Sequence, residues 1–329
     1  MENKLYFSLK DYFLDKYGTR VQKITVALPF TCPNIDGTKG RGGCIYCYAG
    51  SIPPNLSPAK PLRQQIEEAI IRYRKRFKNK NLKFVIYYQS YSNTYGDLDY
   101  LKSVYDVALE FDEVVGIDVG TRPDCAPEEV LDLLASYTDK GLEVWVEYGL
   151  QSANFESLKK INRGHGVSDF VDAVLRTKRR PLKVTAHIII GLPWESEEDF
   201  YETAKMVAAL PIDGLKIHPL YIMDRTPLGE MYKRGEFEPL PLEKYVKIAA
   251  DIIEMMPPQM VIMRFTAEGH DDKLLAPEYC RPAWKAKVKQ MVEEELRRRG
   301  TRQGVRSPFF KHYPLKKNTL ITHIGNRSG

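Results

Sequence analysis

The sequence has 329 residues, of which 43% are apolar and 28% are charged, and a formal net charge of +6. This is the composition of a soluble globular protein, and no apolar run approaches the roughly twenty residues that cross a bilayer. Five cysteines, an odd number, argue against a disulfide framework, and no apolar signal core follows the initial residues. We therefore expect a cytoplasmic protein with no membrane partner, built as one α/β unit with an extension.

The first predicted strand, at 23–28, leads into a glycine-rich loop that carries Cys32, Cys44 and Cys47. Three thiolates without a nearby fourth cysteine or histidine are an incomplete cage for structural zinc, which takes four protein ligands. For a 4Fe–4S cluster three thiolates suffice, and one iron stays free to bind a substrate or cofactor. A zinc site completed by a distant histidine and a redox C-x-x-C motif remain alternatives.

Apolar, β-branched runs alternate with helical patterns along the rest of the chain. Further strands are predicted at 84–88, 114–119, 144–150, 184–190 and 215–222, and helices at 62–77, at 98–109, from Pro127 in the first turn, and from a capping box at Ser196 to Leu210. Near-continuous apolar strands joined by helices indicate a parallel sheet that is covered on both faces. The expected fold is a partial (β/α)6 barrel or an open doubly wound sheet, with its chemistry at the carboxyl ends of the strands.

The expected organisation has four parts. An N-terminal segment at 1–22 precedes a core barrel at 23–235, and an α/β extension follows at 236–310. The tail at 311–329 lacks an apolar stripe, so we expect it to be poorly ordered. Two segments rich in Lys and Arg, at 72–80 and 285–317, are either solvated helix faces or a track for an RNA backbone.

Polar residues follow the second and third strands. Gln89 and Ser90 come first, and Tyr91 and Tyr95 are candidate stacking surfaces for a splayed base, although packing is the commoner role of such tyrosines. Arg122 after the third strand would clamp a carboxylate through two parallel hydrogen bonds, or form a simple surface ion pair.

The later strands also carry polar residues. Glu147 and Gln151 are costly to bury without partners, and a ligand with amino and hydroxyl groups would satisfy them. His165, in the run Asn-Arg-Gly-His, is either a direct participant or, as we favour slightly, a helix-terminal cap. Lys216 and His218 on the sixth strand, and a seventh strand at 264–268, are further candidates for the pocket.

Taken in order, these motifs resemble the radical S-adenosylmethionine (SAM) enzymes. The cysteine loop looks like their cluster loop, and the Glu147 and Asn162–His165 segments are similar to the SAM-contacting segment of the coproporphyrinogen oxidase and Elongator-type branch. Gln89 and Ser90 stand where Gly-Gly-Glu is usual, so the contact to the methionine amino group must differ. His187 replaces the first glycine of the strand that packs against adenine. The resemblance implies that SAM is bound by Gln89, Ser90, Arg122, Glu147, Gln151, Arg163 and Gly191.

The wide Cys32–Cys44 spacing and the segments at 274–284 and 295–304 resemble the YhcC/YtqA (MnmL-like) family over nearly the whole chain. This resemblance implies that Cys32, Cys44 and Cys47 hold a 4Fe–4S cluster and that SAM bound to it yields a 5′-deoxyadenosyl radical. It further implies a role in converting the 5-carboxymethylaminomethyl side chain of the tRNA wobble uridine to 5-aminomethyl. The implied partners are tRNA and an electron donor such as flavodoxin or ferredoxin.

The catalytic residues are not determined by the sequence, and the candidates are His165, Lys216, His218 and Cys280. Cys125 and Cys280 are most simply inert small hydrophobes, with a hydrogen-donor or auxiliary ligand role as the sharper hypothesis for Cys280. Two rival interpretations remain: a radical SAM enzyme that acts on a small molecule or peptide, and a non-catalytic, zinc-stabilised RNA-binding module.

Overall fold

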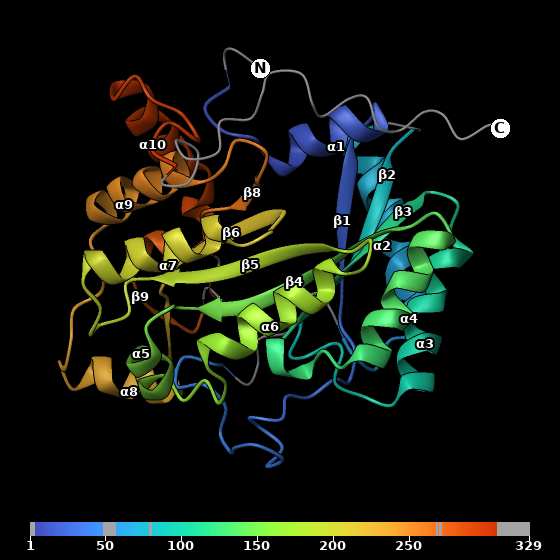
Figure 1. Ribbon diagram of the computed structural model, residues 1–329, viewed down its shortest axis with the longest axis horizontal. Helices are drawn as coiled ribbons and strands as arrows, with labels where there is room; N and C mark the ends of the chain where they lie inside the picture. The colour runs from blue at the N-terminus through green and yellow to red at the C-terminus, as the bar shows by residue number, and fades with distance from the viewer. Residues whose placement is uncertain (1–3, 49–56, 79–80, 268, 270–271, 308–329) are drawn as a thin grey trace.

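The computed structural model describes residues 4–48, 57–78, 81–267, 269 and 272–307. Its centre is a curved parallel sheet of seven strands in the order β1-β2-β3-β4-β5-β6-β8 (Figure 1). The strands are β1 (Val21–Val26), β2 (Lys83–Tyr88), β3 (Val114–Thr121), β4 (Glu143–Gln151), β5 (Lys183–Ile190), β6 (Gly214–Pro219) and β8 (Val261–Arg264). The partial barrel is thus confirmed, and its seventh strand comes from the segment expected to form the extension.

The sixth predicted strand was drawn too long. β6 ends at Pro219, because Ile222 and Met223 leave the sheet as β7 (Ile222–Met223) and pair with β9 (Leu274–Ala276) in a separate antiparallel pair. Both faces of the main sheet are buried, as expected: Phe84, Val85 and Ile86 are successive residues of β2 and none is exposed.

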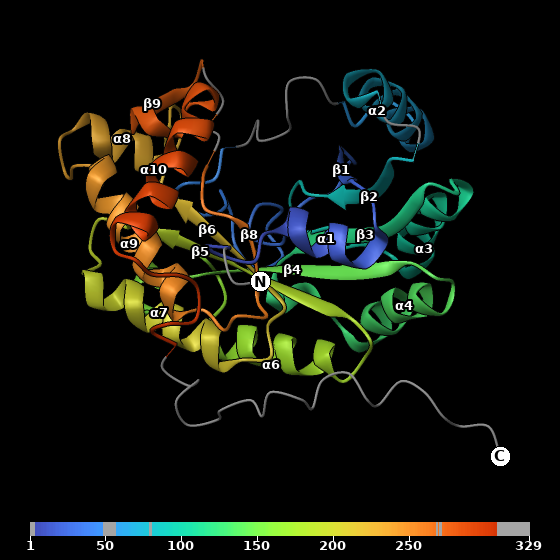
Figure 2. The ribbon, with the colours of Figure 1, turned by 90° about the horizontal axis from the view of Figure 1, so that it is seen from above.

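Helices cover the outside of the sheet (Figure 2). They are α1 (Leu9–Tyr17), α2 (Leu62–Phe77), α3 (Leu98–Asp106), α4 (Glu128–Asp139), α5 (Phe155–Lys160), α6 (Val167–Lys178), α7 (Glu197–Ala209), α8 (Pro227–Lys233), α9 (Leu242–Met255) and α10 (Lys285–Arg298). The prediction at 62–77 is confirmed, as is the capping box in which Ser196 accepts a hydrogen bond from the backbone N–H of Asp199.

Two helix boundaries were predicted wrongly. The helix at 98 ends at Asp106 and continues as the 3₁₀ turn Val107–Glu110. Pro127 precedes α4 as its N-cap and is not part of the first turn. In the part of the chain that the structure describes, no helix is long and apolar enough to cross a bilayer.

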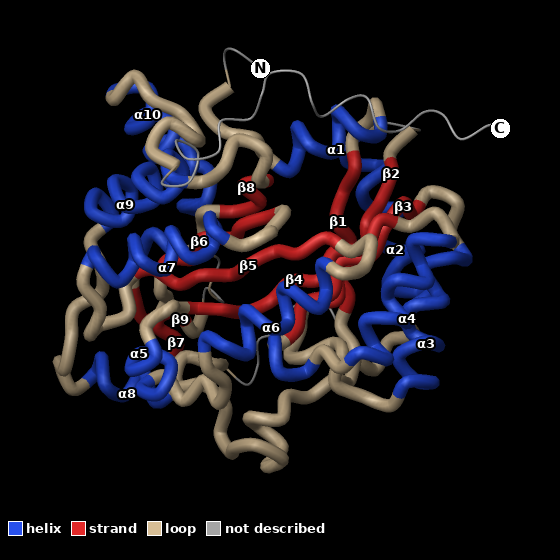
Figure 3. Tube along the Cα trace, in the orientation of Figure 1, coloured by secondary structure: helices blue, strands red, loops and turns tan. Residues whose placement is uncertain are grey.

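Helix α1 closes the amino end of the barrel and lies across the middle of the view in Figure 2. Ser8 forms a bridge with Ile262 of β8, and the Tyr12 hydroxyl donates a 2.8 Å hydrogen bond to Glu143 on β4. The Tyr12 ring also meets Trp145 edge-on, with the centroids 5.5 Å apart. The loops that follow the strands gather at the opposite end (Figure 3), so the accessible end of the barrel is the carboxyl end.

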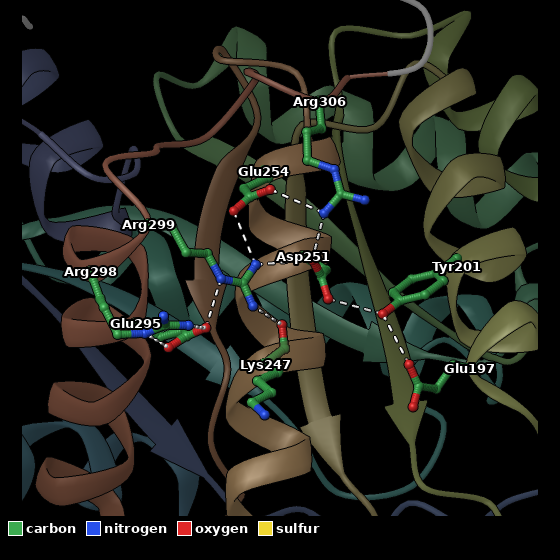
Figure 4. Close-up of polar contacts among 9 residues, drawn as sticks. All are labelled: Glu197, Tyr201, Lys247, Asp251, Glu254, Glu295, Arg298, Arg299 and Arg306. Carbon is green, nitrogen blue, oxygen red and sulfur yellow. Dashed lines mark hydrogen bonds and ion pairs between the residues drawn. The ribbon is translucent and has the colours of Figure 1, made fainter.

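An ion-pair network joins α9, α10 and the segment that follows α10 (Figure 4). Arg299 contacts Asp251 at 2.9 Å, Glu254 at 3.1 Å and Glu295 at 2.7 Å, and Arg306 contacts the same Asp251 and Glu254 from the other side. The Tyr201 hydroxyl donates a 2.9 Å hydrogen bond to Asp251, which links the network to α7. The side chain of Glu254 is only 4% exposed, so its charge depends on these partners.

We expect Arg299→Ala to lower the free energy of unfolding by about 2 kcal/mol, because Asp251, Glu254 and Glu295, all shielded carboxylates, each lose a cationic partner. Arg298→Ala is the matched control, since the Arg298 side chain is 69% exposed and such pairs contribute about 0–1 kcal/mol. Chemical denaturation of both variants checks this, and equal losses would contradict it.

Candidate active site

A cavity of about 290 Å³ lies at the carboxyl end of the barrel. It brings together most of the residues predicted for the site: Cys32, Cys44, Cys47, Gln89, Arg122, Glu147, Gln151, Arg163, Lys216 and His218. Ser90, His165, Gly191 and Cys280 are not among the residues that line it. Tyr91 lines this cavity, whereas Tyr95 lines a separate one of about 670 Å³.

The cysteine loop is fixed by the Asn-Arg-Gly-His segment that follows α5. The Asn162 side chain donates to the carbonyl of Gly43 at 2.8 Å, and the Asn34 side chain donates to the carbonyl of Asn162 at 2.6 Å. Ile45 donates its backbone N–H to Ile161 at 3.0 Å. These contacts hold the cysteine loop in place, and the contact of the same segment with SAM stays a prediction.

Three side-chain donors point at the thiol sulfurs. Nη1 of Arg163 lies 3.7 Å from Sγ of Cys44, and Nδ2 of Asn34 lies 3.8 Å from the same sulfur. Nη1 of Arg122 lies 3.9 Å from Sγ of Cys32. N–H groups directed at sulfur stabilise the thiolate form, which is the form that binds metal.

Arg122 is not a surface residue, so the interpretation as a simple surface ion pair is wrong. The residue is 2% exposed, and its guanidinium meets Asp124 in two parallel hydrogen bonds of 2.9 and 3.0 Å. It does clamp a carboxylate, but that carboxylate belongs to the protein two residues away. Its remaining Nη1 is directed at Cys32.

The donor set fits an iron–sulfur cluster. Three cysteines on one loop face one cavity and have cationic and amide donors around their sulfurs. Burial raises the pKa of the Cys47 thiol to about 11, so deprotonation there has to be coupled to the binding of a cation. Within the described ranges no group of three His, Cys, Asp or Glu side chains is spaced to hold a single metal ion, and the zinc interpretation finds no complete ligand set there.

The floor of the cavity is a buried polar cluster centred on Glu147. Oε1 of Glu147 accepts from Lys23 at 3.1 Å, and Oε2 accepts from Tyr87 at 2.7 Å, from His187 at 2.8 Å and from Lys216. Lys23 also pairs with Asp118 on β3. Four protein groups from four strands therefore satisfy Glu147, so its burial needs no ligand, and its role in binding SAM stays a prediction.

The electrostatics of this floor follow from burial and mutual attraction. Burial alone would raise the pKa of Glu147, but the ammonium groups of Lys216 and Lys23 outweigh burial and hold that pKa well below its usual range. Burial, together with the nearby Glu147 charge, raises the pKa of Asp118 to about 8. Burial lowers the pKa of Lys216 to about 8 and, with Lys216 beside it, that of His187 to about 4. At neutral pH the floor therefore holds charged Lys23, Lys216 and Glu147 and a neutral His187.

The register of the sheet sets this arrangement. His187 on β5 lies beside Lys216 on β6, which lies beside Arg264 on β8, so the three side chains form one row on the inner face. Two residues after Lys216 on β6, His218 stacks on His187 with the ring centroids 5.2 Å apart. Arg264 and Tyr87 also line the cavity, whereas Glu268, predicted beside Arg264, lies outside the described residues.

Three predicted residues do not line the cavity. His165 lies before the N-cap of α6, which is Gly166, so it is not a helix cap. The φ of Gly191 is 103°, and a Cβ there would come within 3.3 Å of Leu240. Ser90 is buried, and its Oγ has no hydrogen-bond partner among the described residues. Their roles as cofactor ligands or catalysts stay predictions.

Cys125 and Cys280 are both buried. Burial raises the pKa of each thiol to about 12, which agrees with inert, protonated side chains. The basic helix α10 packs against α9 and is labelled at the upper left of Figure 1. The last ten residues of the basic segment at 285–317 lie outside the described part, and its role as an RNA track stays a prediction.

We expect Asp118 to make stability depend on pH. A carboxyl whose pKa rises on folding binds more protons in the folded state, so its contribution is present at acid pH and declines as pH rises from about 4 to 8. Asp118→Asn should remove that decline, seen as a flatter profile of unfolding free energy against pH between 5 and 8 in urea titrations. Parallel wild-type and variant profiles would contradict it.

Comparison with known proteins matches these features. A family model described as "Radical SAM superfamily" matches residues 36–207, and one described as "Radical_SAM C-terminal domain" matches residues 212–298. The chain is 36% identical to protein YhcC of Escherichia coli K12 over 83% of this chain and 87% of that protein. It is 35% identical to protein YtqA of Bacillus subtilis over 92% of both chains.

More distant similarities point to a related group. The chain is 32% identical to a tRNA uridine(34) acetyltransferase of Dehalococcoides mccartyi, over 51% of this chain and 36% of that protein. Among solved structures, the Methanocaldococcus infernus Elp3 has a TM-score of 0.62 at 20% identity, covering 87% of this chain and 64% of that one. That structural likeness shows the shared fold. The chain belongs to the radical SAM superfamily and, within it, to the family of YhcC, YtqA and MJ0486.

Proposed function

We propose that this radical SAM enzyme modifies the side chain of the wobble uridine in tRNA, converting 5-carboxymethylaminomethyl to 5-aminomethyl. The observation that carries the proposal is the similarity, over 51% and 44% of this chain, to two proteins named tRNA uridine(34) acetyltransferase. The site supports it, since the cavity combines a cluster-type cysteine loop with a polar floor suited to a charged side chain.

The residues of the chain would divide the work as follows. Cys32, Cys44 and Cys47 hold the cluster, and Arg163 and Asn34 stabilise the Cys44 thiolate through N–H groups directed at its sulfur. When bound, the cluster and SAM supply a 5′-deoxyadenosyl radical that abstracts hydrogen from an unactivated carbon. The protein's own contribution is to position the substrate carbon and to exclude water around it.

The walls of the cavity are what would exclude water around the substrate carbon. α1 closes the amino end of the barrel, and the carboxyl-end wall is built on a second apolar cluster that includes Ile189, Leu220 and Leu228. Ile45 and Tyr46 of the cysteine loop pack against this cluster. A target carbon reaching the cavity would be enclosed by protein on the side of β5 and β6, away from bulk water.

The test is to delete the gene in its native host and to profile the nucleosides of total tRNA by mass spectrometry. We expect carboxymethylaminomethyl-uridine to accumulate and the aminomethyl and methylaminomethyl forms to disappear. Wild type and Cys125→Ala should restore the profile, whereas Cys44→Ala should not. An unchanged profile would overturn the tRNA proposal and direct attention to a small molecule or peptide.

The catalytic step makes a second, separate prediction. Abstraction beside the nitrogen would leave a carbon radical, which forms an imine by giving one electron to the oxidised iron–sulfur electron-transfer system and the N–H proton to water. Hydrolysis of the imine then gives the amine and glyoxylate. With RNA deuterated at the methylene between nitrogen and carboxylate, deuterium is expected in 5′-deoxyadenosine. Its absence, together with the absence of glyoxylate, would contradict this route.

A further inference from the structure

Two polar groups on β6 face the cavity with hydrogen-bonding capacity that the protein does not use. An ammonium group has three N–H donors, and Lys216 gives one to Tyr87 at 2.9 Å and one to Glu147. The third finds no acceptor among the described residues. Nε2 of His218 is shielded from solvent and is also without a hydrogen-bond partner in the described part of the chain.

Lys216 and His218 are two residues apart on the same strand, so both side chains project from its inner face. Both line the cavity, and His187 stacks against His218 and holds its ring. The Lys216 side chain is 7% exposed, and its ammonium group is held by Glu147 and Tyr87. The pair is therefore preorganised, and buried donors without acceptors are costly unless a ligand supplies acceptors.

The charges around this pair favour an anion. Glu147 is the carboxylate closest to Lys216, but it is shared with Lys23, Tyr87 and His187, so its lone pairs are occupied. Asp118, the other acid of the floor, pairs with Lys23. Among the described residues Lys216 therefore has one carboxylate partner, which it shares with Lys23 and His187. A second carboxylate would give the remaining N–H of Lys216 an acceptor of its own.

We propose that Lys216 and His218 form a carboxylate-binding subsite on the floor of the cavity, and that it receives the carboxylate of the substrate side chain. The identity of that substrate rests on the proposed function. The other available source of the same chemistry is the methionine carboxylate of SAM. The subsite makes the carboxymethyl end the specificity element, since it would hold that end deep in the cavity.

The first experiment compares two synthetic anticodon stem-loops that carry carboxymethylaminomethyl-uridine, one with the free carboxylate and one with its primary amide. Wild-type holoenzyme should prefer the free acid by roughly 10- to 100-fold in kcat/KM, the usual range for a charge-assisted hydrogen bond. Lys216→Met should raise KM for the free acid by a similar factor, so that kcat/KM becomes equal for the two RNAs. Lys205→Met, on an exposed side chain of α7, is the matched control and should match wild type.

His218→Leu removes a donor without touching the Glu147 contacts, so it tests the subsite even if Lys216→Met is unstable. It should lose part of the preference for the acid. Preference retained in folded Lys216→Met and in His218→Leu would overturn the subsite. SAM affinity and RNA-independent 5′-deoxyadenosine formation should be unchanged in His218→Leu. If His218→Leu loses SAM affinity as well as the preference for the acid, the carboxylate bound at this subsite is that of SAM, and its assignment to the substrate is overturned.

A second experiment stands apart from the proposed function. Sarcosine carries a secondary amine beside a carboxylate, and its binding is measured by saturation-transfer NMR. Transfer is expected with wild type and Lys205→Met, and it should be lost with Lys216→Met and with sarcosinamide as probe. If wild type turns over neither RNA but binds sarcosine in this pattern, the tRNA proposal fails and the subsite stands. If wild type shows no transfer, the subsite fails.

Discussion

A Cys44→Ala variant purified without oxygen is expected to lose the iron–sulfur cluster, with iron falling from about four atoms per chain to background. The reason is that three thiolates are the minimum set in this loop, and Cys44 is the one whose sulfur receives donors from both Asn34 and Arg163. Formation of 5′-deoxyadenosine with a chemical reductant should fall below detection. Iron and sulfide analysis, together with that assay, measures the effect.

The chain supplies its own controls for this prediction. Cys125→Ala and Cys280→Ala remove buried thiols that do not line the cavity, so both variants should keep the cluster and SAM cleavage. Full iron in Cys44→Ala would contradict the assignment of the loop. Lost iron in Cys280→Ala would instead revive an auxiliary ligand role for that residue.

Glu147→Gln is expected to lower the free energy of unfolding by about 3–5 kcal/mol, the range for removing one partner of a buried ion pair. The amide keeps the size of the side chain but leaves Lys23 and Lys216 without the carboxylate that they share. Glu156→Gln, on a 67% exposed side chain, is the control and should change stability by less than about 1 kcal/mol. Denaturant titrations of both variants make the comparison.

A double variant shows how much of the destabilisation by Glu147→Gln comes from the charge imbalance that it leaves on the floor of the cavity. Glu147→Gln with Lys216→Met removes one charge of each sign, so it should be less destabilised than the two single variants added together. Strict additivity would mean that Glu147 and Lys216 do not depend on each other. Because Glu147 is fully occupied by protein donors, we also expect its loss to affect SAM binding only through disturbance of the floor.

The strands were predictable because their apolar, β-branched runs are buried on both faces, and this signal needs no knowledge of neighbours. The cysteine loop was predictable for a similar reason, since its ligands lie close together in sequence. Helix α1 was missed, although Ser8 and Asp11 form a capping box that announces it. The expected N-terminal segment is therefore the closure of the barrel.

The floor of the cavity was only partly predictable. Lys23, Tyr87 and Asp118 each lie within an apolar strand, and nothing local shows that they meet Glu147. Their meeting depends on the register of parallel strands and on the curvature that brings β1 toward β6. A polar residue at an inward position of each strand in turn was the available signal. Arg122 was misjudged because its partner, Asp124, lies only two residues away in a tight turn.

The addition of β8 to the sheet has a consequence for biogenesis. Arg264 on β8 completes a row whose other members lie on β5 and β6, and Ser8 pairs with Ile262 of the same strand. During synthesis the cysteines therefore leave the ribosome long before the strand that finishes the wall around them. We expect stalled nascent chains that end before β8 to be protease-sensitive at α1, and productive metal loading to occur only after release of the finished chain.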